Sequence, residues 1–157
     1  MLRAFPALVL AAWLAGSTPG WAVMGYGTFV TLADGTMRVV QALKRGDKLA
    51  GPDTEQREIF AISTVENAEL VTIITNKGRK LVVGKGHPIP IIRGEAPFIA
   101  SDIRVGDRVY SIEGFETVEI VEAAKPGIAY KLSIGEPGTS ERDPLYANGL
   151  MVSDEPI

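Results

Sequence analysis

The chain contains a single histidine, His87, in the stretch VVGKGHPIPII, where it lies between branched apolar residues and is flanked by Gly86 and Pro88. An imidazole with an unperturbed pKa of about 6.5 can gain or lose a proton near neutral pH, so it can act as a general acid or base. The alternative is a buried ring that hydrogen bonds hold in place and that the core packs around. His87 is therefore the first candidate for chemistry in this sequence.

A catalytic histidine needs partners, and the sequence offers few of them. Asp102 and Asp107 follow His87 and are candidate carboxylate partners, although turn formation explains each of them equally well. The chain has no cysteine, which excludes thiol nucleophiles and thiolate metal sites. One histidine and scattered carboxylates do not have the spacing of a metal site. We expect no metal and no cofactor.

The first 22 residues, MLRAFPALVLAAWLAGSTPGWA, have the layout of a secretory signal peptide. Arg3 precedes an apolar stretch, and a Gly-Ser-Thr-Pro break leads to the small residue Ala22, after which we expect cleavage. The apolar stretch is shorter than the roughly 20 residues that a spanning helix needs. A retained signal anchor is the alternative. The sequence predicts a secreted or periplasmic protein without a membrane segment after cleavage.

Removal of residues 1–22 would leave 135 of the 157 residues, which is enough for one domain, residues 23–157, with its own core. The whole chain has 16 Lys and Arg and 19 Asp and Glu, a net charge of −3 that becomes −4 when Arg3 is lost. Neither a basic excess nor a polybasic run is present, so we expect no nucleic-acid partner. Without cysteines, the core alone must hold an exported domain together.

Short strand patterns separated by Gly and Pro predict an all-β domain. In GTFVTLADGTMRVV, apolar residues flank Asp34-Gly35, which predicts a hairpin with a primed turn. LVTIITNKGRKLVV predicts a second hairpin, with Asn76-Lys77-Gly78 between its strands. TVEIVEA, AYKLSI and LYANGLMV each predict later strands.

The segments ALKRGDKLAG and SDIRVGDRVYS repeat one pattern, and their glycines, Gly46 and Gly106, are 60 residues apart. An apolar strand pattern follows each copy, EIFAIST in the first case and TVEIVEA in the second. A chance match of a short motif is the alternative. The echo predicts a duplicated half of about 60 residues, with two halves in one barrel-like body. In each copy the Gly-Asp pair predicts a tight turn in which Asp binds nearby backbone.

Four stretches, in order, resemble the Hedgehog/intein (Hint) family of self-processing domains: GTFVTLADGT, LVVGKGHPI, SDIRVGDRV and YANGLMVSD. They resemble, in turn, the block after the nucleophile, the block with the catalytic His-Pro, the segment that follows it, and the terminal strand that normally ends in His-Asn. The resemblance covers nearly all of residues 23–154. It implies a horseshoe-like all-β fold with pseudo-twofold symmetry, which would also explain the echo.

The resemblance also assigns positions to the chemistry. The family's Cys or Ser nucleophile matches Val23, and the helper Thr before the histidine matches Gly84, so neither position has the side chain that the reaction needs. His87 is retained. The terminal His-Asn pair matches Ser153 and Asp154, and an aspartate cannot cyclise as asparagine does.

Two kinds of function remain open, together with a third possibility. The first is an exported Hint-fold domain that has lost splicing and acts as a non-catalytic module, binding an envelope or extracellular protein or serving a structural role. The second is residual self-cleavage that uses His87 or Asp154. The third is a relic without a partner. A polar loop, Gly135–Pro144, is a candidate binding lip, although a mobile connection is the default for such a loop.

Overall fold

The computed structural model describes residues 22–53, 55–91, 98–138 and 142–155, and strands dominate it. The predicted all-β class is confirmed. No helix in the described ranges is long and apolar enough to cross a membrane. In chain order the elements are β1 (Val23–Gly25), β2 (Phe29–Thr31), β3 (Met37–Val39), the 3-10 turn η2 (Val40–Ala42), β4 (Lys48–Leu49), β5 (Arg57–Thr75), β6 (Lys80–Gly84), β7 (Pro88–Ile89), β8 (Phe98–Ile99), the 3-10 turn η3 (Ala100–Asp102), β9 (Arg108–Ser111), β10 (Gly114–Ile134), β11 (Pro144–Ala147) and β12 (Leu150–Ser153).

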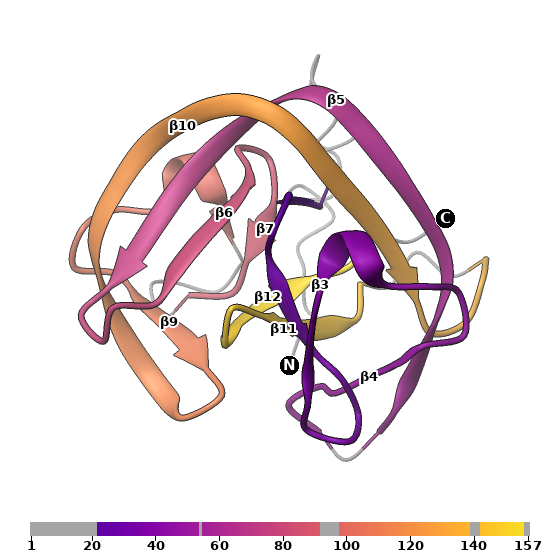
Figure 1. Ribbon diagram of the computed structural model, residues 1–157. Coiled ribbons are helices and arrows are strands. Elements are labelled where there is room, and N and C mark those ends of the chain that lie inside the picture. Colours follow the sequence, from indigo (N-terminus) through magenta and orange to yellow (C-terminus); the bar gives the residue numbers. More distant parts are fainter. Residues whose placement is uncertain (1–21, 54, 92–97, 139–141, 156–157) are drawn as a thin grey trace.

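Two long strands, β5 and β10, pair antiparallel and arch together over the body (Figure 1). The prediction of separate strands for TVEIVEA and AYKLSI is wrong, because both belong to β10. Pro126, which has no N–H to donate, lies between them in the sequence. A register shift between Ala124 and Gly127 accommodates it, so the strand continues instead of ending.

The sequence echo has a structural counterpart in two turns of the same geometry. Gly46 N–H donates to Ile59 O at 2.8 Å, and Gly106 N–H donates to Val118 O at 2.8 Å. The two glycines have φ angles of +94° and +95°, a left-handed conformation that side chains disfavour. Each turn leads into a short strand, β4 or β9, that pairs with the start of β5 or β10. The predicted two-half architecture therefore has a direct structural basis.

The aspartate of each copy closes its turn as predicted. One carboxylate oxygen of Asp47 accepts the N–H of Lys44 at 2.8 Å, and the same oxygen of Asp107 accepts the N–H of Arg104 at 2.8 Å. The short turns η2 and η3 precede the two copies at matching positions. The motif Gly-Asp thus shapes the backbone in both halves.

One hydrophobic core joins the two halves. Val30 and Ile73 from the first half and Leu132 and Leu145 from the second are almost inaccessible to solvent in the same cluster. A smaller cluster forms around Val23 at the start of β1. The chain has no cysteine, so this shared burial holds the halves together.

The two turn types differ from the expectation. The hairpin of β2 and β3 forms at Asp34-Gly35, but its turn is not primed: the N–H of Gly35 donates to Leu32 O at 2.9 Å, and only Gly35 has a positive φ there. A single left-handed glycine closes this longer loop. A primed turn does occur between β11 and β12, where Asn148 and Gly149 have φ angles of +49° and +80°.

Replacing either turn glycine by alanine tests the repeat. A Cβ at Gly46 or Gly106 would meet no atom within 4 Å, so the cost is purely conformational and should be equal at the two sites. We expect Gly46→Ala and Gly106→Ala each to lower the free energy of unfolding by about 1–2 kcal/mol in denaturant titrations. Gly127→Ala, at an equally open position without positive φ, is the control and should not destabilise. Unequal losses at the two turns would contradict their equivalence.

Candidate functional site

His87 lies in the connection between β6 and β7 and is completely buried. Its main chain is fixed on both sides, since the N–H of His87 donates to Gly84 O at 2.9 Å and its carbonyl accepts the N–H of Ala100 at 2.8 Å. The predicted helper position, Gly84, is thus a backbone acceptor in the turn that presents the histidine. It has no hydroxyl to place beside the ring.

The ring of His87 contacts the main chain of the first strand. Its Nδ1 lies 3.0 Å from the carbonyl oxygen of Val23 in β1. A carbonyl can only accept a hydrogen bond, so Nδ1 must carry the proton, and in a neutral ring Nε2 is then unprotonated. Within the described part of the chain, Nε2 is buried without a hydrogen bond.

Burial lowers the pKa of His87 from 6.5 to about 4. The backbone of Val23 and that of Ser153 favour the charged ring, but the nearby cation of Arg142 adds to the lowering. The ring is therefore neutral at pH 7. It has no proton to spare as a general acid, and its free nitrogen is a weak base.

Neither carboxylate that the sequence suggested as a partner orients the ring. Asp107 instead accepts the backbone N–H of Arg104 in its own turn. Asp102 is exposed at the end of η3, and the contact at Nδ1 of His87 is with a main-chain carbonyl. The structure therefore corrects the pairing of His87 with Asp102 or Asp107, because the turn geometry of the repeat uses that part of the chain.

Val23, the position that matches the nucleophile, is buried in β1 opposite Lys131 of β10. Its side chain packs with Ala68, Leu70 and Ala129. The structure thus brings the first predicted position and the histidine together through a main-chain carbonyl. Val23 itself contributes only an apolar side chain to this contact.

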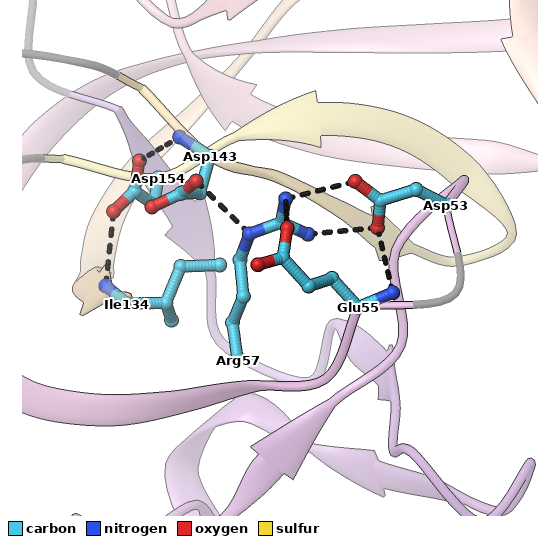
Figure 2. Close-up of polar contacts among 6 residues, drawn as sticks. All are labelled: Asp53, Glu55, Arg57, Ile134, Asp143 and Asp154. Carbon is cyan, nitrogen blue, oxygen red and sulfur yellow. Dashed lines mark hydrogen bonds and ion pairs between the residues drawn. The ribbon is translucent and has the colours of Figure 1, made fainter. Parts of the chain in front are cut away.

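Asp154, directly after β12, uses both carboxylate oxygens on the backbone (Figure 2). Oδ1 accepts the N–H of Asp143 at 2.6 Å, and Oδ2 accepts the N–H of Ile134 at 2.9 Å. In return, the N–H of Asp154 donates to Asp143 O at 2.9 Å. Two donors facing two oxygens suit a carboxylate better than an amide, whose NH₂ group cannot accept.

Burial raises the pKa of Asp154 from 3.8 to about 7, although the two backbone N–H groups favour the charged form. The charge of Asp143 raises this pKa further, and that of Arg142 lowers it. Arg142 also donates from Nη1 to the Asp154 carbonyl at 2.9 Å. The carbonyl that would have to react is therefore polarised, while the side chain that would have to attack it is held elsewhere.

A charge network beside Asp154 has no motif in the sequence. The Nε of Arg57 lies 3.0 Å from Oδ1 of Asp143, and its two Nη atoms contact both oxygens of Asp53 at 3.0 and 2.8 Å (Figure 2). Glu55 adds a contact at 3.0 Å. The spacing of Asp53 and Arg57 could have suggested their pairing, but nothing local indicates Asp143.

A second buried charge, Glu116, is also satisfied within the fold. Thr75 Oγ1 donates to it at 2.6 Å and Arg79 Nε at 2.7 Å. Burial raises the pKa of Glu116, but these hydrogen bonds outweigh burial and leave the pKa below its usual value. Glu116 is thus a structural anchor of β10.

The remaining surface offers little that could hold a small ligand. An open hollow of about 340 Å³ is lined by Leu32, Ala33, Asp34, Lys48 and Gln56. Across the described ranges, no three or more His, Cys, Asp or Glu side chains converge as metal ligands. The cluster around His87 and Asp154 is therefore the best-defined candidate site.

No protein-family model and no curated protein matches the sequence. Solved structures do match its fold. The chain is similar to a DnaB intein from Synechocystis sp. PCC 6803 (TM-score 0.71, 10% identity, 85% of this chain and 99% of that one) and to the gp41-1 intein (0.70, 15%, 83% and 97%). It is also similar to a bacterial intein-like domain from Clostridium thermocellum (0.68, 20%, 84% and 98%). The chain therefore has the all-β Hint fold that the sequence resemblance implied.

Proposed function

We propose that this protein is an exported Hint-fold domain that has lost protein splicing and acts as a non-catalytic binding or structural module. The contact between His87 Nδ1 and the Val23 carbonyl carries this proposal. It supports a ring that ties the first strand to the core, at the place where a self-processing domain would need a nucleophile.

The first step of self-processing lacks its reactive atom. Acyl transfer to a side chain requires a nucleophilic oxygen or sulfur. Val23 has neither, and its side chain is buried among apolar residues. His87, neutral and without a bound carboxylate, could not supply the missing nucleophile.

The last step is disfavoured for a different reason. Cyclisation of a terminal asparagine uses its amide nitrogen, which Asp154 does not have. Attack by a carboxylate oxygen would require Asp154 to give up the N–H donor at 2.6 or 2.9 Å that holds that oxygen. The polarised carbonyl of Asp154 is the one observation that favours the rival, residual cleavage at this end.

Export and a protein partner are the other parts of the proposal. Residues 1–21 lie outside the described residues, so the signal-peptide prediction depends on the sequence alone. The predicted partner is a protein of the envelope or extracellular space, and the proposed contact loop, Gly135–Pro144, is described only at its two ends. Affinity capture with the exported domain, compared with a variant in which a short turn replaces this loop, tests the contact. Equal capture by both would exclude the loop.

Intact mass of the exported protein separates the two functions. We expect one species that begins at Val23 and ends at Ile157, because neither reactive side chain is available for self-cleavage. The same mass should be found for His87→Ala and for Asp154→Ala. A shorter species that disappears in either variant would establish residual self-cleavage and overturn the proposal.

The Asp154→Asn variant tests whether this residue is a structural clamp. The amide can accept only one of the two backbone N–H groups, so we expect a loss of about 1–3 kcal/mol in the free energy of unfolding at pH 5. Asp34→Asn is a matched control, since a single oxygen of Asp34 accepts both the N–H and the Oγ1 hydrogen of Thr36. An amide oxygen can keep both bonds, so this variant should change stability little.

The pH dependence of the Asp154→Asn effect has a defined sign. The folded state raises the pKa of Asp154 from 3.8 to about 7, so this group binds more protons in the folded than in the unfolded chain across that window. Its contribution to stability is therefore largest near pH 4 and is lost as the pH rises to about 7. Chemical denaturation from pH 4 to 8 should show a variant deficit that shrinks with rising pH. A deficit that grows with pH would contradict the assignment.

A further inference from the structure

The backbone that enters β1 meets a carboxylate from the opposite end of the chain. The N–H of Ala22 donates to Oε1 of Glu155 at 2.8 Å, although 133 residues separate them. Ala22 is 1% exposed, and the Glu155 side chain is 16% exposed. A neutral N–H does not require a charged acceptor in so buried a place.

Glu155 is held firmly in this position. Its N–H donates to Leu132 O at 2.8 Å, and its carbonyl accepts the hydroxyl of Ser133. Arg142 Nη1 lies 3.6 Å from the same carboxylate oxygen that Ala22 contacts. The carboxylate is thus aimed at the point where the chain enters β1.

Cleavage after Ala22 would place a positive α-ammonium group on Val23, which is 4% exposed. A buried cation without a partner is strongly disfavoured. Around Val23 the other groups are unsuitable as counter-ions: His87 is neutral, Lys131 lies opposite in the strand pair, and the oxygens of Asp154 bind backbone.

Glu155 has both the charge and the position. Successive Cα atoms are about 3.8 Å apart, so the new ammonium would begin within one residue of the carboxylate that Ala22 now contacts. Loss of Ala22 also frees Oε1 and the buried volume that Ala22 occupies. Arg142 remains on the same oxygen, so the carboxylate would lie between two cations.

We propose that Glu155 binds the α-ammonium group of Val23 that removal of residues 1–22 creates, so that processing locks β1 to the segment after β12. This inference rests on the export processing in the proposed function. It adds a site for the mature amino terminus that the full-length chain lacks.

The α-amino pKa of Val23, measured by NMR in the mature protein, tests this site. The usual value is about 7.7–8.0, and an opposite charge in contact raises it. We expect Glu155→Gln to lower the measured pKa by about one unit or more relative to the wild type. Glu119→Gln, at an exposed position of β10, is the control and should leave it unchanged. Equal values in the wild type and Glu155→Gln would overturn the inference.

Stability gives an independent reading with a defined sign. An ammonium whose pKa is raised by folding stabilises the fold below about pH 8, and this contribution is lost as the pH rises through the folded-state pKa. Acetylation of Val23 should abolish that loss in the wild type and have no such effect in Glu155→Gln.

The two proposals can fail separately. An exported protein that does not begin at Val23 would contradict the processing, and the same titration would then use a chain released at Val23 by a site-specific protease. A chain that begins at Val23 with an unshifted α-amino pKa would contradict only the role of Glu155.

Discussion

The last four residues of β10, Lys131–Ile134, hold both ends of the described chain beside the same buried histidine. Lys131 pairs with Val23 in β1, Leu132 accepts the N–H of Glu155, and Ile134 donates to Asp154. The long antiparallel pairing of β10 with β5 keeps this segment in place. The geometry of the candidate site therefore depends on a main-chain scaffold more than on the side chains at its centre.

Burial decides the charge state at this centre. It lowers the pKa of His87 to about 4 and raises that of Asp154 to about 7, so each side chain is shifted toward its neutral form. Each also makes its hydrogen bonds with main-chain groups, the Val23 carbonyl for one and two backbone N–H groups for the other. Side chains used in this way stabilise a fold, and they are poorly placed to exchange protons with a reacting group.

Local chemistry made part of this structure predictable. Asn76-Lys77-Gly78 marked a hairpin that the structure contains, and the Gly-Asp repeat marked two equivalent turns because the glycines need positive φ. The resemblance brought Val23, His87 and Asp154 into one site before any coordinates. The structure places the first two in contact, and Ser153, next to Asp154, faces the same ring.

Long-range contacts were not predictable in the same way. Arg57 and Asp143 meet only because β5 and the segment before β11 are brought together by the sheet, and no spacing in the sequence encodes that. The continuity of β10 through Pro126 was missed because a proline usually ends a strand, whereas here a bulge accommodates it. The Asp34-Gly35 turn was assigned the wrong type because the same residue pair suits both primed turns and longer loops closed by one left-handed glycine.

The tautomer of His87 at neutral pH, read from the ring ¹⁵N shifts of the folded protein, tests the central claim most directly. A structural ring bound to the Val23 carbonyl should be neutral, carry its proton on Nδ1, and resist protonation until the pH falls well below 6. A ring that is protonated at pH 7, or that carries its proton on Nε2, would show that His87 is available for proton transfer and would contradict its assignment as a structural residue.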